Sequence, residues 1–143
     1  MEMMPLGCLP YIKAQNGGCC IDGITQFAKL HNSGFPKALN ELKEKLDGFK
    51  YAHYNFFESV GERLNNPSKY GNGEGRGVYS CGGKRRVTEF ILCDNPDDYL
   101  FFDAYHFSEK AYQQFAKLMW GGTIDVVWPY NFKTLFQAND QMF

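Results

Sequence analysis

The sequence lacks the features that mark membrane-spanning, nucleic-acid-binding and signal-bearing proteins. No apolar run approaches the roughly 20 residues that a membrane-spanning helix needs. Lysine and arginine number 15 and aspartate and glutamate 16, a net charge of -1, so no basic stripe exists to displace counterions from a nucleic acid. The basic residues 84–86 are interpreted as a solvated loop, and residues 1–5 do not form a secretion signal. We therefore expect no nucleic-acid partner, no transmembrane segment and no signal peptide in this chain.

Spacings typical of metal and redox sites are also missing. The five cysteines form neither a paired zinc motif nor a Cys-x-x-Cys redox motif. His31 and His53 have no ligand-like neighbours at zinc or iron spacing. The sequence predicts neither a metal site nor a cofactor.

The cysteines gather instead in two places along the chain. Cys8, Cys19 and Cys20 lie near the start, and Cys81 and Cys93 flank a polar loop, which at this length is normally either pinned or functional. We expect two local disulfides, one joining Cys8 to Cys19 or Cys20 and one joining Cys81 to Cys93. Such bridges indicate an oxidising compartment. The alternative is free, buried cysteines in a cytosolic protein.

The composition supports a folded domain. With 143 residues, 44% of them apolar, the chain is long enough for one domain with a hydrophobic core. Apolar residues recur at intervals of three or four between Ile21 and Leu46, which predicts one long amphipathic helix or two stacked ones. Gly34 and Pro36 interrupt this pattern and predict a kink or break at residues 33–36.

An aromatic segment follows this predicted helix. Residues 49–57 are nearly free of charge, which predicts a buried strand and hence half of a parallel crossover unit. His53 is expected to be packed inside it. A short helix is expected at 58–64, because the proline at 67 ends helical structure before it. Residues 67–98 are expected to be mostly loop, and their glycines lack the flanking strand and helix of a nucleotide-binding turn.

The two ends of the chain have weaker signals. Residues 5–10 contain two prolines and a glycine, which predicts a strand end that turns into a loop. Ser108 is a good N-cap for a helix at 109–119, which two glycines end. The tail around residues 128–132 has no regular period and is expected to cover the body as an apolar strap.

Asp103 and His106 form the candidate functional pattern of the chain. A carboxylate three residues before an imidazole can hold the ring's Nδ1–H, which leaves the other ring nitrogen free to act as a general base. No serine of the chain has a recognisable nucleophile setting, so the sequence predicts half of an active site. The alternatives are a surface ion pair, hydrogen bonds at the start of a helix, or a metal pair.

Five stretches of the chain become specific when they are taken together and in order. They are Pro-Leu-Gly-Cys-Leu-Pro at 5–10, Leu-His-Asn at 30–32, Asn-Pro-Ser-Lys-Tyr-Gly at 66–71, Phe-Asp-Ala-Tyr-His-Phe-Ser-Glu at 102–109 and Pro-Tyr-Asn-Phe-Lys at 129–133. In this order they resemble the C-terminal portion of the plant GDSL esterase/lipase family. The resemblance covers nearly the whole chain.

This resemblance implies an α/β fold. It would be the C-terminal part of an SGNH-type α/β/α sandwich with a flavodoxin-like parallel sheet, its N-terminal strands missing, so that residues 1–143 form a single partial domain. The resemblance also implies hydrolysis of carboxylic esters, with an acyl ester or a lipid as substrate, and an extracellular, secreted protein.

The resemblance assigns roles to two residues. In the family, the Asp and His of an Asp-x-x-His block complete a triad with a serine near the N-terminus, and a glycine and an asparagine share the oxyanion hole with that serine. Asp103 and His106 match this last block. The three earlier blocks have no match here, so we expect the chain to be inactive alone.

Some residues depart from the family pattern. Phe107 and Ser108 stand where the family has proline and threonine, and Asn55 stands where members usually have aspartate. The segment 71–77 is shortened. These departures favour a truncated product over a tuned enzyme.

Three hypotheses follow for the chain. It is the C-terminal piece of a secreted ester hydrolase that needs its missing N-terminal half. Alternatively, it is a non-catalytic remnant that binds another hydrolase chain or a lipid. In the third hypothesis it is a self-contained, disulfide-stapled binding domain whose aromatic strand is covered internally.

Overall fold

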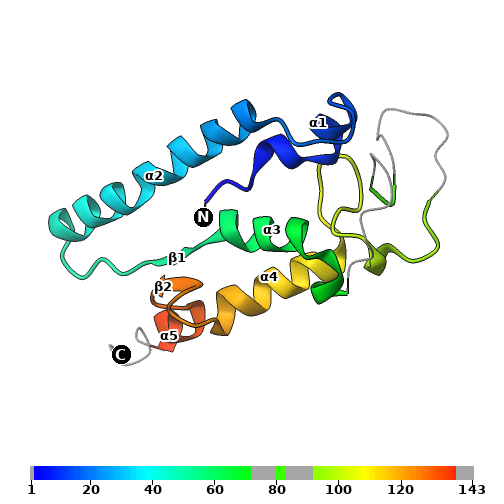
Figure 1. Cartoon of the computed structure of the whole chain (residues 1–143). Coiled ribbons are helices and arrows are strands. Elements are labelled where there is room, and N and C mark those ends of the chain that lie inside the picture. Colours follow the sequence, from blue (N-terminus) through cyan, green and yellow to red (C-terminus); the bar gives the residue numbers. More distant parts are fainter. Residues whose placement is uncertain (1, 72–79, 83–91, 138–143) are drawn as a thin grey trace.

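The computed structural model describes residues 2–71, 80–82 and 92–137. Short 3-10 turns (η), helices and strands follow one another in this order: η1 (Leu6–Cys8), α1 (Pro10–Ala14), α2 (Asp22–Lys45), β1 (Ala52–Tyr54), α3 (Phe56–Asn65), η2 (Pro67–Tyr70), η3 (Pro96–Asp98), α4 (Glu109–Gly121), β2 (Val127–Pro129) and α5 (Phe132–Gln137). In Figure 1, α2 runs along one side of the molecule, and α3 and α4 lie next to each other. The mixed α/β class predicted from the sequence is confirmed. The basic residues 84–86 and most of the glycine-rich segment lie outside the described residues.

Helix α2 runs unbroken through Pro36, so the predicted break, and with it the alternative of two stacked helices, is wrong. Proline removes one N–H donor from a helix, so the carbonyl of Asn32, four residues before Pro36, receives no helical hydrogen bond from that position. Pro36 is exposed, and the turns before it are held to the body by the buried residues Ala28 and Asn32. The 24-residue helix therefore tolerates one missing hydrogen bond.

The segment before α2 is packed tightly under that helix. The Ile21 N–H donates to the Gly7 carbonyl at 3.0 Å. A Cβ atom added at Gly7 would collide with the Ile21 carbonyl, so only glycine fits there. The strand end predicted at residues 5–10 is wrong, because Pro10 instead begins α1 with the fixed φ that suits a first helical position.

The aromatic strand is shorter than predicted. Asn55 ends it, because its side-chain oxygen accepts the Glu58 N–H at 3.2 Å and caps α3. The short helix predicted at 58–64 is confirmed and begins two residues earlier, at Phe56.

The partner of β1 comes from the tail of the chain. β1 pairs antiparallel with β2, with Ala52 opposite Pro129 and Tyr54 opposite Val127. The tail therefore contains a strand and the helix α5, and the prediction of an irregular strap is wrong. A parallel neighbour for β1, as a crossover unit requires, is not found among the described residues.

The core is an aromatic cluster between α3, α4 and the segment that precedes α4. Phe56, Phe107 and Phe115 meet edge to face, with ring centroids 5.1 to 5.8 Å apart. Such pairs each contribute about 0.5–1.5 kcal/mol beyond the area they bury. The cluster fixes the start of α4 against α3, and this start, Glu109, lies three residues after His106.

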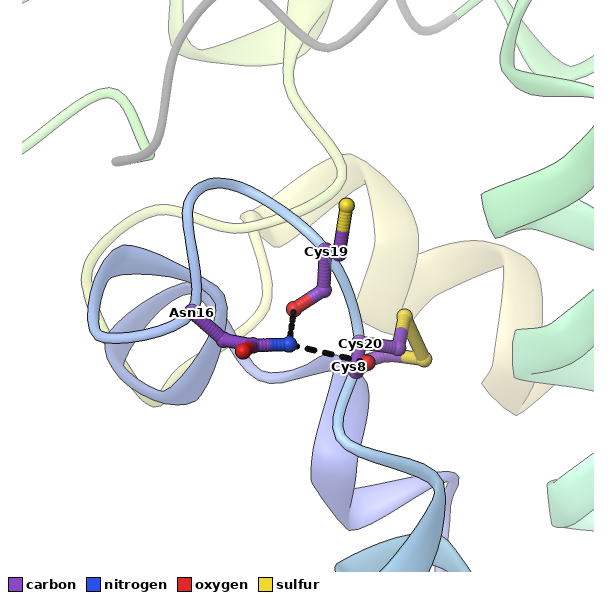
Figure 2. The surroundings of a disulfide bond; sticks show 4 residues. All are labelled: Cys8, Asn16, Cys19 and Cys20. Carbon is purple, nitrogen blue, oxygen red and sulfur yellow. Dashed lines mark hydrogen bonds between the residues drawn. A yellow bond between two sulfur atoms is a disulfide. The ribbon is translucent and has the colours of Figure 1, made fainter.

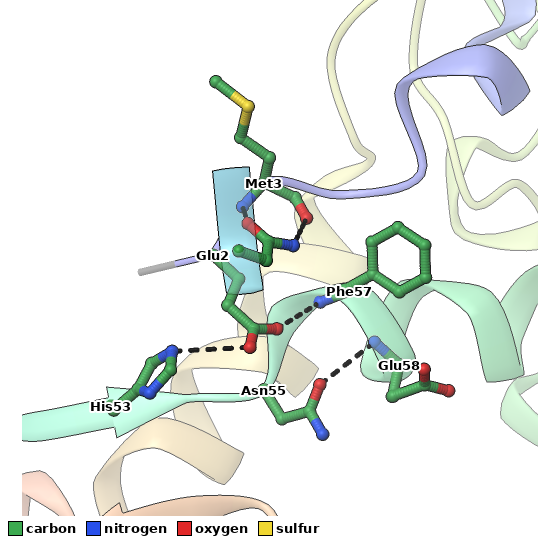
Figure 3. A network of polar contacts seen from close by, with 7 residues as sticks. Glu2, Met3, His53, Asn55, Phe57 and Glu58 are labelled. Carbon is green, nitrogen blue, oxygen red and sulfur yellow. Dashed lines mark hydrogen bonds and ion pairs between the residues drawn. The ribbon is translucent and has the colours of Figure 1, made fainter. Parts of the chain in front are cut away.

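A polar network ties the first residues to three elements (Figure 3). The Met3 N–H donates to the Asn32 side chain in α2, and Asn32 donates back to the Met3 carbonyl, both at 2.8 Å. One Glu2 oxygen accepts the Phe57 N–H in α3 at 3.1 Å, and the other lies 3.4 Å from Nε2 of His53 in β1. The N-terminal segment thus connects α2, α3 and β1 through polar contacts.

His53 is packed, as predicted. Its ring is 1% exposed and lies 4.3 Å from the ring of Trp128 and 5.6 Å from that of Phe35. Burial lowers the pKa of His53, and burial also raises the pKa of the neighbouring Glu2 carboxyl. Burial therefore shifts the pKa of each group in the direction that disfavours its charged form.

The burial of His53 predicts a pH-dependent stability. Because its folded pKa lies below the ordinary value of 6.5, the unfolded chain takes up this proton first. We expect the free energy of unfolding to fall as the pH drops through the window below 6.5. His53→Phe, which keeps the aromatic packing, should lose this part of the dependence. Denaturant unfolding monitored by circular dichroism at several pH values measures it.

His31→Phe provides the matched control, because His31 is exposed on α2. Glu2 acts with the opposite sign, since its raised pKa stabilises the fold as the pH falls, and it is present in all three proteins. If wild type and His53→Phe showed parallel pH profiles, the buried neutral histidine would be refuted.

Candidate active site

The candidate site is a tight turn built on the Asp103 carboxylate. Asp103 is 1% exposed, and its Oδ1 accepts the N–H groups of Tyr105 at 2.9 Å and of His106 at 2.8 Å. The same carboxylate meets Nδ1 of the His106 ring at 2.8 Å and 3.0 Å. The structure thus brings together the two residues that the sequence singled out.

A short hairpin carries this turn. The Phe102 N–H donates to the His106 carbonyl at 2.8 Å, and Phe101 and Phe107 form an antiparallel bridge with stacked rings 4.8 Å apart. The Ser108 N–H then donates to the Leu100 carbonyl at 3.0 Å. The hairpin arms hold Asp103 and His106 at its tip.

Helix α4 fixes the arm of the hairpin that follows the turn, at Phe107 and Ser108. The buried Ser108 hydroxyl accepts the Ala111 N–H at 3.3 Å, so the predicted N-cap is confirmed. Glu109 lies in the first turn, where a carboxylate interacts favourably with the helix dipole. The predicted helix at 109–119 is confirmed and extends to Gly121.

The electrostatics of the turn favour an ionised Asp103. Burial raises the pKa of this carboxyl, but the N–H donors of Tyr105 and His106, together with the imidazole, outweigh burial and hold the pKa below its ordinary value. A carboxylate that only accepts hydrogen bonds requires a proton on Nδ1 of the neutral His106 ring. The His106 side chain is 50% exposed, so Nε2 is the nitrogen that remains for acid–base chemistry.

Helix α1 lies against the other side of the turn. The Tyr11 N–H donates to the Ala104 carbonyl at 3.2 Å, and the rings of Tyr11 and Tyr105 lie 5.1 Å apart. Sequence reasoning missed this contact, because nothing in the spacing of residues 11 and 105 signals it. Tyr105 is about half exposed beside the imidazole.

A disulfide closes the segment that contains α1 (Figure 2). Cys8 is bridged to Cys20, which decides between the two predicted partners, and Cys19 keeps an exposed free thiol that points away from the bridge. The Asn16 amide donates to the carbonyls of Cys19 and Cys20, each at 3.3 Å. The predicted bridge between Cys81 and Cys93 is also confirmed.

A pocket between α3 and α4 has a volume of about 580 Å³ and is lined in part by Arg63. This guanidinium is 3% exposed and lies over the rings of Tyr70 and Phe115, 4.2 and 4.7 Å from their centroids. It donates to the Ser59 carbonyl at 2.8 Å and to the Gln114 side chain at 3.1 Å. Because these donors bind neutral protein groups, Arg63 serves to join α3 to α4.

The described part of the chain has neither the ligand cluster of a metal site nor a membrane-spanning helix. In residues 2–71, 80–82 and 92–137, no three histidine, cysteine or carboxylate side chains gather as a metal site would need. Within the same ranges, no helix is long and apolar enough to cross a membrane.

The turn geometry predicts the effect of removing its carboxylate. Asp103→Ala leaves the Tyr105 and His106 N–H groups without their acceptor, and we expect the free energy of unfolding at neutral pH to fall by about 1–3 kcal/mol. The pKa of Asp103 in the folded chain lies below its ordinary value of 3.8, so the ionised carboxylate stabilises the fold fully above pH 3.8. This stabilisation is lost as the pH falls through the folded pKa. The difference from wild type should therefore shrink in acid. Denaturant titration of wild type and Asp103→Ala, at neutral pH and in acid, measures this difference in the free energy of unfolding.

Asp125→Ala is the control, since Asp125 is an exposed aspartate. It should leave the unfolding free energy within about 0.5 kcal/mol of wild type. Equal stability of Asp103→Ala and wild type at neutral pH would contradict the hydrogen-bonded turn.

Comparison with known proteins identifies the relatives of this chain. The profile of the family described as GDSL-like Lipase/Acylhydrolase matches residues 1–119. GDSL esterase/lipase 4 of Arabidopsis thaliana is 42% identical over 96% of the chain, and the GDSL lipase of Tanacetum cinerariifolium is 41% identical over 93% of it. An Arabidopsis thaliana relative named Inactive GDSL esterase/lipase-like protein 25 is 34% identical over 94% of the chain.

These relatives are longer than this chain. The matched region is 40% of GDSL esterase/lipase 4, 39% of the Tanacetum lipase and 33% of the inactive relative. No solved structure matches the chain significantly. The match to the family profile over residues 1–119, with the mixed α/β fold consistent with part of an SGNH-type sandwich, shows that the chain belongs to the GDSL-like lipase/acylhydrolase family.

Proposed function

We propose that the chain supplies the Asp103–His106 half of a Ser-His-Asp site for hydrolysis of carboxylic esters. The observation that carries this proposal is the orientation of the imidazole, with Nδ1 held by a buried carboxylate and half of the ring surface exposed. A surface ion pair needs neither the buried acid nor the two N–H donors on it. The family of the chain supplies the reaction class.

In this mechanism His106 acts as the proton carrier. Its Nε2 takes the proton from a serine hydroxyl as that oxygen attacks the ester carbonyl. His106 then gives the proton to the leaving alcohol, and a water repeats the sequence on the acyl-enzyme. Asp103 fixes the tautomer of the ring and stabilises the imidazolium that forms, which suits a carboxyl held in its ionised form.

We propose that these 143 residues do not hydrolyse esters by themselves. Among the described residues, the His106 ring has no hydroxyl partner, and the nearby Ser108 hydroxyl is buried as the cap of α4. Loss of one oxyanion donor costs about 3–4 kcal/mol of transition-state stabilisation in such sites. A proton carrier that has no serine hydroxyl to deprotonate and no oxyanion donors beside it cannot complete this mechanism.

The substrate class is an acyl ester or a lipid, by extension from relatives named esterase and lipase. The compartment that suits the chain is extracellular, because its two disulfides are stable under oxidising conditions.

A non-catalytic role is the second candidate. It draws support from the relative whose name includes the word inactive, and from Phe27 and Leu30, which are 72% and 73% exposed on α2. Exposed apolar side chains of this kind suit a protein or lipid contact. The hypothesis of a self-contained binding domain requires that the aromatic strand be covered internally. This requirement fits the strand residues His53 and Tyr54, which are each 1% exposed.

The test joins to this chain the N-terminal part of the Arabidopsis thaliana GDSL esterase/lipase 4, where the family resemblance places the serine, and measures hydrolysis of a short-chain nitrophenyl ester. We expect no hydrolysis by the chain alone and turnover by the fusion. His106→Ala should lower the turnover of the fusion by about 10²–10⁴-fold, the range that general acid–base catalysis contributes.

His31→Ala is the control for this loss, since His31 is exposed on α2, away from the Asp103 turn. Hydrolysis by the unfused chain that His106→Ala abolishes would refute the proposed inactivity. A folded but silent fusion would favour the non-catalytic role.

A further inference from the structure

The incoming arm of the hairpin has its own support, separate from α4. The backbone carbonyls of Phe101 and Phe102 accept hydrogen bonds from the short segment 80–82. The Cys81 N–H donates to the Phe101 carbonyl at 3.4 Å, and the Gly82 N–H donates to the Phe102 carbonyl at 2.5 Å. Phe102 is the residue immediately before Asp103.

This supporting segment is itself held by the disulfide. Cys81 is 4% exposed and is bonded to Cys93, and the Cys93 N–H donates to the Cys81 carbonyl at 3.2 Å. The bridge therefore ties Cys81, which is hydrogen-bonded to the hairpin, to a residue twelve positions later in the chain. A crosslink of this kind restricts the positions open to residues 80–82 when they part from the hairpin.

Gly82 makes the close approach possible. A Cβ atom at this position would lie 3.0 Å from the Phe102 carbonyl oxygen, which is tighter than an ordinary contact. Glycine lets the two backbones meet and form their hydrogen bond. The segment thus fits the hairpin at the point where the chain turns toward Asp103.

We propose that Cys81, Gly82 and Cys93 are positioning residues for the Asp103–His106 pair. They hold the Phe102 carbonyl, and through it they set the place of the Asp103 carboxylate relative to its N–H donors and to the imidazole. The importance of this positioning for ester hydrolysis rests on the function proposed above. The geometric effect itself is independent of that function.

The test is an NMR titration of the full chain carrying Cys81→Ser together with Cys93→Ser. We expect the pKa of Asp103 to rise toward the ordinary carboxyl value, because its donors move away. The Tyr105 and His106 amide protons should exchange with solvent at least about tenfold faster, as local opening becomes easier. A lower melting temperature with both readouts unchanged would overturn the proposal, since the bridge would then stabilise the fold without positioning the pair.

Two variants that keep both bridges complete the test. Cys19→Ser removes the exposed free thiol and should leave both readouts unchanged; a shift there would overturn the assignment to the bridge. Gly82→Ala pushes on the Phe102 carbonyl and should shift both readouts in the direction of the double variant. Unchanged readouts in Gly82→Ala refute the proposal even where the double variant does not fold. None of these measurements needs an ester, so failure here is distinct from failure of the fusion to hydrolyse one.

Discussion

The organisation of the site depends on one buried carboxylate that gathers its donors from within four residues. Asp103 accepts two backbone N–H groups and one ring nitrogen, so the backbone turn and the imidazole orientation are set by the same atoms. A buried charge is tolerated only when such partners are present. Turn geometry and chemistry are therefore coupled, because neither the backbone nor the ring of His106 can move without loss of a hydrogen bond to Asp103.

Support for this turn comes from parts of the chain far apart in sequence. Helix α4 holds one arm of the hairpin through the Ser108 cap, and α1 touches the tip through Tyr11. The segment bridged to Cys93 holds the other arm through backbone hydrogen bonds. Each disulfide thus has a residue near it in sequence that donates a backbone hydrogen bond to the hairpin, Tyr11 in one case and Gly82 in the other.

The sequence predicted the local parts of this arrangement well. The Asp-x-x-His spacing, the Ser108 cap and the helix it begins depend on residues within one or two turns of each other, and all three are found in the structure. The predicted break at Pro36 failed because it considered only the local effect of proline. The buried residues Ala28 and Asn32 hold the helix to the body through contacts with residues distant in sequence, which the local pattern does not show.

What the sequence by itself determined is the family, the mixed α/β class, the pairing of Asp103 with His106 and the presence of two short-range disulfides. Tertiary structure alone decided that Cys20 rather than Cys19 joins Cys8, that β1 pairs with β2, and that Glu2 lies beside the buried His53. The physical reason is the range of the interactions. Caps and turns close over a few covalent bonds, whereas strand pairing, the choice between two cysteines and the neighbour of a buried histidine depend on which distant surfaces the packed core brings together.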